Sequence, residues 1–194
     1  MSKFWFGSRY VYHCFVFAVF LLASGAVTEA DEARLWAKIK DGEAFAIIRH
    51  AMAPGTGDPE NFSVADCTTQ RNLSQRGREQ ARNIGRRFRA NSIVAADIYS
   101  SEWCRCMETA KLLAIGEVRT LPVMNSFYET MERREIQTRA LRQWLTEHGG
   151  TKPLILVSHQ VNILALTGRS TGSGEAIVAK IDTSGQVTVL GSLD

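Results

Sequence analysis

Two of the four histidines in this chain come directly after short apolar runs of the kind that form buried strands. His50 ends the run Ile47-Ile48-Arg49-His50, and His159 ends Leu156-Val157-Ser158-His159. Open α/β sheets bind ligands beyond the carboxyl ends of their strands, so both histidines are expected at one edge of a sheet. A third apolar run leads into Tyr99-Ser100-Ser101 and then Arg105. Histidines grouped with arginines predict catalysis on an anionic substrate.

Apolar runs alternate with amphipathic segments along the chain, which is typical of an α/β fold. Residues 53–70 carry the glycine and proline signals of a long loop, and Ser74 is a good N-cap for the helix that follows. We therefore expect one domain over residues 31–194, a three-layer α/β/α sandwich with a mostly parallel central sheet. Its last two strands flank a hairpin turn at Ser184-Gly185. The predicted helices cover residues 31–40, 74–91, 105–113, 133–148 and 161–166, and the predicted strands cover 44–48, 93–99, 118–123, 154–157, 176–181 and 186–190.

The N-terminus has the order of a secretory signal peptide. Lys3 and Arg9 precede an apolar run over residues 10–23, and the small residues Ser24-Gly25-Ala26 follow. We predict cleavage after Ala26, with Ala30 as the alternative, and export to the periplasm or the extracellular space. If the segment is retained, it becomes a membrane anchor, although 14 apolar residues are short of the roughly 20 that span a bilayer.

The composition narrows the class of protein. With 194 residues, 45% of them hydrophobic and 22% charged, the chain is neither disordered, nor collagen-like, nor a polytopic membrane protein. The formal net charge of +3 includes the two basic residues of the predicted signal peptide, so the body is close to neutral. A near-neutral body does not favour nucleic acid as a partner.

Three cysteines remain after the predicted cleavage, and an oxidising compartment permits a disulfide. Cys67 is expected to pair with Cys104 or with Cys106, because a bridge between the last two would be strained. A zinc site is the alternative, but no further ligand lies at the usual spacing.

These residues resemble the histidine phosphatase superfamily, whose members are phosphoglycerate-mutase-like. The resemblance extends over residues 44–181 and rests on four segments in the family's order. They are Arg49-His50 after an apolar strand, Leu73-Ser74-x-x-Gly77-x-x-Gln80-Ala81 at a helix start, Tyr99-Ser100-Ser101 followed by Arg105, and Val157-Ser158-His159.

The resemblance implies a phosphatase that works through a phosphohistidine and needs no metal or other cofactor. His50 would be the nucleophile, and Arg49, Arg105 and His159 would surround the phosphoryl group. Phosphoryl transfer depends mainly on positioning and on positive charge around the phosphoryl oxygens, so this set of residues suits it. The expected substrate is a phosphorylated small molecule or glycan.

The sequence departs from the family's pattern around the phosphate and at the proton donor. Ala51 follows His50 where Gly-Glu is common, which leaves Thr56 as the candidate additional phosphate ligand. The family's glutamate falls by order near Asn125, so we expect Glu129 or Glu132 to supply the acid. An alternative for both glutamates is an ordinary solvated position at the start of a helix.

Two alternatives therefore stay open, a phosphohistidine-protein phosphatase and a catalytically inactive anion-binding module. Export disfavours the first, and the retained histidines and arginines disfavour the second. The predicted helix after Ser74 also carries Arg78, Arg82, Arg86 and Arg89 on one face. This face is either a solvated polar surface or a contact with an anionic envelope surface.

Overall fold

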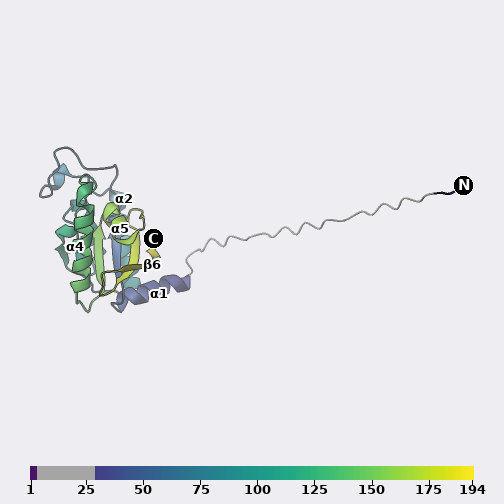
Figure 1. The fold of residues 1–194 in the computed structure, drawn as a ribbon. Coiled ribbons are helices and arrows are strands. Elements are labelled where there is room, and N and C mark those ends of the chain that lie inside the picture. Colours follow the sequence, from purple (N-terminus) through teal and green to yellow (C-terminus); the bar gives the residue numbers. More distant parts are fainter. Residues whose placement is uncertain (4–28) are drawn as a thin grey trace.

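The computed structural model describes residues 1–3 and 29–194, so most of the predicted signal peptide lies outside the described residues. Six strands form one sheet in the order β3-β2-β4-β1-β5-β6 (Figure 1). Strands β1 to β4 run parallel to one another, whereas β5 is antiparallel to β1 and β6 is antiparallel to β5. The strands are β1 (Phe45–Arg49), β2 (Asp97–Ser100), β3 (Val118–Thr120), β4 (Leu154–Ser158), β5 (Ala176–Ile181) and β6 (Val187–Leu193).

Helices cover both faces of this sheet because its central strands are apolar on both sides. Along β1, Ala46 and Ile48 face one cluster of buried side chains while Phe45 and Ile47 face the other. The first cluster includes side chains of α1, α2 and α3, and the second those of α4 and α5. The helices are α1 (Glu29–Lys40), α2 (Gln75–Ala90), α3 (Cys104–Leu113), α4 (Arg134–Glu147) and α5 (Gln160–Thr167). The predicted three-layer sandwich with a mostly parallel sheet is confirmed.

Most predicted elements are present, and two predicted strands are shorter than expected. The strand predicted over residues 93–99 begins only at Asp97, because Ile93 still bonds to Phe88 at the end of α2. The strand predicted over residues 118–123 ends at Thr120, and the segment Pro122–Met124 forms a 3-10 turn. Proline has no backbone N–H to donate to a sheet, which explains the early end.

Helix α2 shows how a local signal sets an element. The Ser74 side chain accepts a hydrogen bond from the Gly77 backbone N–H, and this cap begins the helix as predicted. Gly77 also lies under the loop after His50, where a Cβ atom would come within 2.1 Å of the Met52 carbonyl oxygen. The loop can therefore cross the start of α2 only over a glycine.

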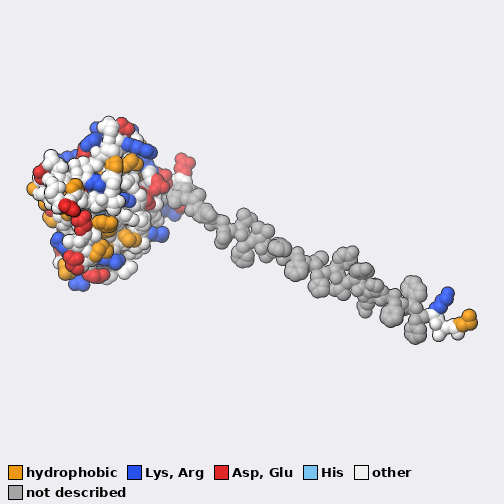
Figure 2. All heavy atoms as spheres, turned by 90° about the horizontal axis from the view of Figure 1, so that it is seen from above, with side chains coloured by type: hydrophobic (Ala, Val, Ile, Leu, Met, Phe, Trp, Pro, Cys, Tyr) orange, Lys and Arg blue, Asp and Glu red, His pale blue; other side chains and the backbone are white. Residues whose placement is uncertain are grey.

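The arginine-rich face of α2 is partly engaged inside the molecule. Arg78 pairs with Glu108 at 2.6 Å, and Arg89 donates to the Leu113 carbonyl, while Arg82 and Arg86 are exposed. Figure 2 shows basic side chains interspersed with acidic and hydrophobic ones on the face it presents. Within the described residues, no helix combines the length and the apolar composition that crossing a membrane requires.

Candidate active site

His50 lies just beyond the carboxyl end of β1 and is almost completely buried, with 2% of its surface exposed. Its ring nitrogen Nδ1 is 2.8 Å from the backbone oxygen of Ala51. A carbonyl oxygen can only accept, so this bond requires the ring proton on Nδ1. The other nitrogen, Nε2, therefore keeps its lone pair and is the nucleophilic atom of the ring.

His159 lies beyond the carboxyl end of the neighbouring strand β4, with its ring centroid 5.6 Å from that of His50. Ser101, which follows β2, has its hydroxyl 2.8 Å from His159 Nε2 and donates to the Asn125 side chain at 3.2 Å. The Cys106 thiol packs on the same ring, 3.5 Å from Nε2. Three neighbouring strands thus bring the two histidines together and hold the ring of His159.

Three arginines surround the histidines. Arg49 ends β1 and donates to the Thr171 carbonyl at 2.8 Å, and Arg105 comes from the first turn of α3. Arg71, from the loop before α2, donates to the Gly57 carbonyl at 2.9 Å and to the Ala53 carbonyl. The Nε–H groups of Arg49 and Arg105 are buried and have no hydrogen-bond partner among the described residues. Buried donors of this kind are suited to an anionic ligand.

The arginines and the burial keep both histidines neutral. Burial lowers the pKa of His50 to about 3, and the charges of Arg105, Arg71 and Arg49 add to this, against the opposing effect of the bond to Ala51. Burial and the same three cations hold the pKa of His159 well below its usual value. At neutral pH, His50 is therefore an unprotonated imidazole in a positively charged site, and its Nε2 can act as a nucleophile.

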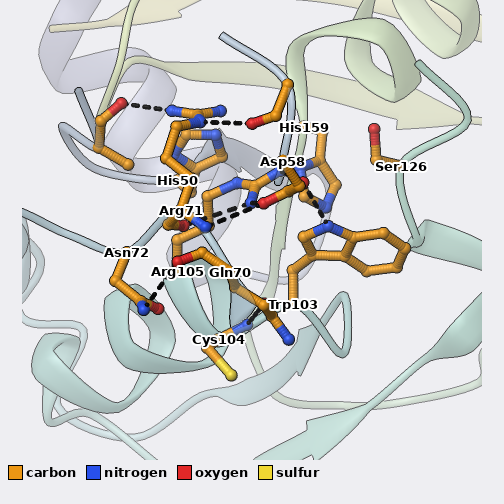
Figure 3. Close-up of polar contacts among 12 residues, drawn as sticks. His50, Asp58, Gln70, Arg71, Asn72, Trp103, Cys104, Arg105, Ser126 and His159 are labelled. Atoms are coloured by element: carbon orange, nitrogen blue, oxygen red, sulfur yellow. Dashed lines mark hydrogen bonds and ion pairs between the residues drawn. The ribbon is translucent and has the colours of Figure 1, made fainter. Parts of the chain in front are cut away.

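An acidic residue lies in the middle of this positive charge. Asp58 forms a two-point ion pair with Arg105, with oxygen–nitrogen distances of 2.7 Å and 3.1 Å. Its carboxylate also accepts from the Trp103 indole N–H and from the Arg71 backbone N–H, both at 3.0 Å (Figure 3). Burial raises the pKa of Asp58, but these bonds and the Arg105 charge more than offset it and hold that pKa below its usual value. Asp58 is a carboxylate at neutral pH.

The loop that carries Asp58 is fastened to the start of α3. Cys67 and Cys104 form a disulfide, and Cys106 is free and buried, so the predicted bridge from Cys67 is confirmed with Cys104 as its partner. The Gln70 side-chain oxygen also accepts a hydrogen bond from the Cys104 backbone N–H at 2.9 Å. The loop between His50 and α2 is therefore held beside the helix that supplies Arg105.

The two histidines, the three arginines around them and Asp58 line one cavity of about 350 Å³. Of the sequence-predicted residues, Thr56 and Glu129 lie in its wall, Glu129 with an exposed side chain. Glu132 is exposed and is not among the lining residues. The predicted residues Arg49, His50, Arg105 and His159 also line the cavity, together with the aromatic side chains Phe62, Trp103 and Tyr128. Within residues 1–3 and 29–194, no three His, Cys, Asp or Glu side chains are grouped so that they could hold a metal ion.

Three residues of the cavity, Asp58, Arg71 and Trp103, were not among the site residues predicted from the sequence. All three lie within or next to segments that the sequence patterns did single out, since Asp58 belongs to the loop after His50 and Trp103 precedes Arg105 by two residues. An acid within ten residues of the expected nucleophile was a usable signal. Its pairing with Arg105, 47 positions later, depends on how the loop folds back.

The comparisons with known proteins agree with this geometry. Residues 45–129 match the model of the histidine phosphatase superfamily, branch 1. No curated protein sequence matches the chain.

Solved structures share the fold at low sequence identity. The protein histidine phosphatase SixA, solved with tungstate, is 14% identical, with a TM-score of 0.58 over 78% of this chain and 96% of its own. A mycobacterial glucosyl-3-phosphoglycerate phosphatase is 15% identical, with a TM-score of 0.56 over 75% and 96% of the two chains. A phosphoserine phosphatase from Entamoeba histolytica, solved with 3-phosphoglyceric acid, is 17% identical, with a TM-score of 0.54 over 78% and 96%. Over residues 45–129, and in its fold, the chain is similar to members of the histidine phosphatase superfamily.

Proposed function

We propose that this protein is a phosphatase that hydrolyses a phosphomonoester through a phosphohistidine on His50. The observation that carries the proposal is the hydrogen bond from His50 Nδ1 to the Ala51 carbonyl, which leaves Nε2 unprotonated in a cavity lined by four arginines, Arg49, Arg71, Arg105 and Arg133. A neutral imidazole nitrogen among guanidinium groups is suited to attack a phosphoryl group whose oxygens those groups bind.

The reaction needs two displacements at phosphorus. In the first, His50 Nε2 forms a bond to phosphorus while the bond to the ester oxygen breaks, and the departing oxygen takes a proton. In the second, water attacks the phosphohistidine, the phosphorus–nitrogen bond breaks, and inorganic phosphate leaves with His50 restored. Arg49, Arg105 and Arg71 bind the phosphoryl oxygens throughout, and His159 lies beside them in the cavity wall.

We assign the proton donor for the first step to Glu129. It lies in the cavity wall, and its carboxylate is close to the backbone of Gly57 in the loop that carries Asp58. The paired carboxylate of Asp58 is unsuited to this role, since the ion pair with Arg105 favours its charged form. Glu129 is the lining carboxylate left to protonate a leaving oxygen.

The dimensions of the cavity favour a small substrate or the end of a glycan. A volume of about 350 Å³ is at the low end of small-molecule sites. Phe62 stacks on Trp103 with ring centroids 4.9 Å apart, so the wall beside the arginines offers an apolar surface to the part of the substrate that departs. A phosphorylated sugar or other small organic phosphate fits a site with a cationic base and an aromatic wall.

A phosphohistidine-protein phosphatase is the second candidate. The placement of Glu129, exposed on the wall of the cavity, favours it, because a phosphoramidate depends less on a well-placed acid than a sugar phosphate does. The similar fold of SixA, described as a protein histidine phosphatase, is in line with this candidate.

A panel of phosphorylated substrates tests the proposal. The full chain, with the Cys67–Cys104 bridge oxidised, should release inorganic phosphate from at least one sugar phosphate or small phosphomonoester, and the matched His50→Ala chain should not. Preference for a phosphohistidine protein over every small phosphomonoester would select the second candidate. Phosphate binding without turnover of either class would favour an anion-binding module.

We further propose that the protein is exported and acts in the periplasm or outside the cell. The disulfide is in line with an oxidising compartment. Helix α1 begins at Glu29, so cleavage after Ala26 would keep that helix whole, whereas cleavage after Ala30 would remove its first two residues. Mass spectrometry of the protein from its host should find Val27 as the first residue. An intact Met1 or Ser2 would contradict export with cleavage.

A further inference from the structure

The ion pair between Asp58 and Arg105 is almost inaccessible to solvent, with side-chain exposures of 9% and 3%. Its two partners come from different parts of the chain, the loop after β1 and the first turn of α3. A buried ion pair costs desolvation energy, so its occurrence in the wall of the catalytic cavity needs an explanation beyond stability. The explanation must also account for a negative charge in a site that binds an anion.

The Asp58 carboxylate has a full set of donors. One oxygen accepts from Arg105 Nη1 and from the Arg71 backbone N–H, and the other from Arg105 Nη2 and from the Trp103 indole N–H. Figure 3 shows the carboxylate between the Arg105 guanidinium and the Trp103 ring. Two of these donors belong to Arg105, and the other two, a backbone amide and an indole, hold the carboxylate independently of it.

The position of Asp58 is also set from both sides of its loop. The Cys67–Cys104 bridge and the bond between Gln70 and Cys104 fasten the far end of the loop to the start of α3. Arg71 bonds back to the carbonyls of Ala53 and Gly57, which precede Asp58 in the same loop. These contacts hold the Asp58 carboxylate in one position beside Arg105.

Arg105 keeps donors that Asp58 does not use. A guanidinium has five N–H groups, and the pair with Asp58 takes one from each terminal nitrogen, while Nη1 also donates to the Arg71 carbonyl at 3.4 Å. The Nε–H of Arg105 is buried without a partner in the described part of the chain, and so is that of Arg49, the other arginine of the predicted phosphate site. The free edge of Arg105 can therefore meet a phosphoryl oxygen while its terminal edge stays on Asp58.

We propose that Asp58 is the positioning residue for Arg105, and that the phosphoryl group binds the donors of Arg105 that Asp58 leaves free. This role deepens the proposed phosphatase function by adding a residue to the same site. For the loss of the Asp58 charge, this role predicts a change in anion affinity opposite to the one that electrostatic repulsion alone predicts. Removing a negative charge beside an anion site should strengthen anion binding, whereas removing the support of Arg105 should weaken it.

Binding of inorganic phosphate separates these two outcomes without requiring turnover. Isothermal titration calorimetry would compare the oxidised full chain with Asp58→Asn, which keeps the size of the side chain and removes its charge. We expect phosphate to bind the variant 10-fold or more weakly. The matched control is Asp66→Asn in the same loop, where the exposed side chain bonds only to Thr68. The control should bind phosphate within 2-fold of the wild type.

A second arm tests whether the effect runs through Arg105. In an Arg105→Ala background, Asp58→Asn should cause no further weakening of phosphate binding, because the group it positions is gone. Trp103→Phe, which removes the indole donor to Asp58 and keeps an aromatic ring against Phe62, should weaken phosphate binding in the same direction and less. This variant keeps the test available if Asp58→Asn does not fold, as judged by its thermal unfolding transition.

Three results would overturn the inference. The first is phosphate binding that is unchanged or tighter in Asp58→Asn, or in Trp103→Phe if Asp58→Asn does not fold. The second is a loss of phosphate affinity on Asp58→Asn that is equal in the wild-type and the Arg105→Ala backgrounds. The third is a wild-type chain that does not bind phosphate. If the expected pattern of binding appears but the wild type hydrolyses no phosphorylated substrate, the role of Asp58 stands and the proposed phosphatase function fails.

Discussion

His50 donates its Nδ1 proton to the carbonyl of Ala51, the next residue in the chain, at 2.8 Å. The bond joins neighbouring residues, so the local backbone conformation after β1 sets the tautomer of His50. Because the site lies at the carboxyl ends of β1, β2 and β4, Arg49 and Arg105 come from segments that the sheet already brings together.

Arg105 should not tolerate replacement by lysine. Arg105→Lys keeps one positive charge but loses the planar group that bonds to Asp58 at two points and keeps further donors free. We expect kcat/KM to fall by on the order of 10²–10³, mainly through kcat. Steady-state kinetics on the best substrate would measure this, with Arg82→Lys on the exposed face of α2 as the control. A loss smaller than threefold would remove Arg105 from the catalytic site.

The effect of removing the Glu129 carboxyl group on the rate of hydrolysis should be larger for substrates with poorer leaving groups. Glu129→Gln removes the proposed acid, so hydrolysis of an alkyl or sugar phosphate should slow by on the order of 10². A nitrophenyl phosphate needs no protonation of its leaving oxygen and should react at nearly the wild-type rate. Glu132→Gln, at an exposed position outside the cavity, serves as the control. Equal losses on both substrates would argue against an acid role for Glu129.

The two buried histidines should make the fold sensitive to mild acid. Their pKa values are lowered in the folded state, to about 3 for His50, so below the ordinary value of 6.5 the unfolded chain binds protons that the folded chain does not. Stability is thus complete above pH 6.5 and falls as the pH decreases toward the folded value. Each histidine contributes a slope of up to about 1.4 kcal/mol per pH unit.

Urea unfolding between pH 7.5 and 4.5 would measure this slope, and the His50→Asn chain measured in parallel separates the contribution of the histidine from that of carboxyl groups, which begin to take up protons near the acid end of the range. His50→Asn should reduce the slope of the free energy of unfolding against pH by the contribution of about one proton. A free energy of unfolding that does not change between pH 6.5 and 4.5 would show that the histidines are not neutral in the folded protein.

The Cys67–Cys104 bridge should support both stability and activity. In the chain-entropy model, a bridge between residues 37 positions apart stabilises the fold by about 3–4 kcal/mol. The Cys67→Ser/Cys104→Ser chain should lose this stability, and its kcat/KM should fall as the loop with Asp58 loosens. Adding reductant should lower the melting temperature of the wild type toward that of the variant, which itself should not respond. A reductant-insensitive wild type would mean that the bridge is not formed.

The sequence was sufficient for the fold and for the central residues of the site because both depend on local signals. Apolar runs mark the strands, Ser74 marks the start of α2, and residues at strand ends must meet at one edge of a parallel sheet. His50 and His159 could therefore be assigned to one site, although 109 positions separate them.

Contacts made by the long loop could not be predicted in this way. Asp58 and Arg71 enter the site because the loop folds back over the start of α2, and no periodic pattern records that path. The disulfide was predicted as a choice between Cys104 and Cys106, and only the orientation of α3 decides it. Cys104 faces the loop, whereas Cys106 is buried against His159.

The most direct measurement of the central claim is the chemistry of the trapped intermediate. A rapid reaction with a phosphate-labelled substrate, quenched in alkali, should leave the label on His50 as a phosphoramidate, stable to base and destroyed by acid, and His50→Ala should carry none. Peptide mapping would locate the label. Label that survives acid, as phosphoserine does, or that persists in His50→Ala, would contradict His50 as the nucleophile and would point to Ser101 or another group of the site.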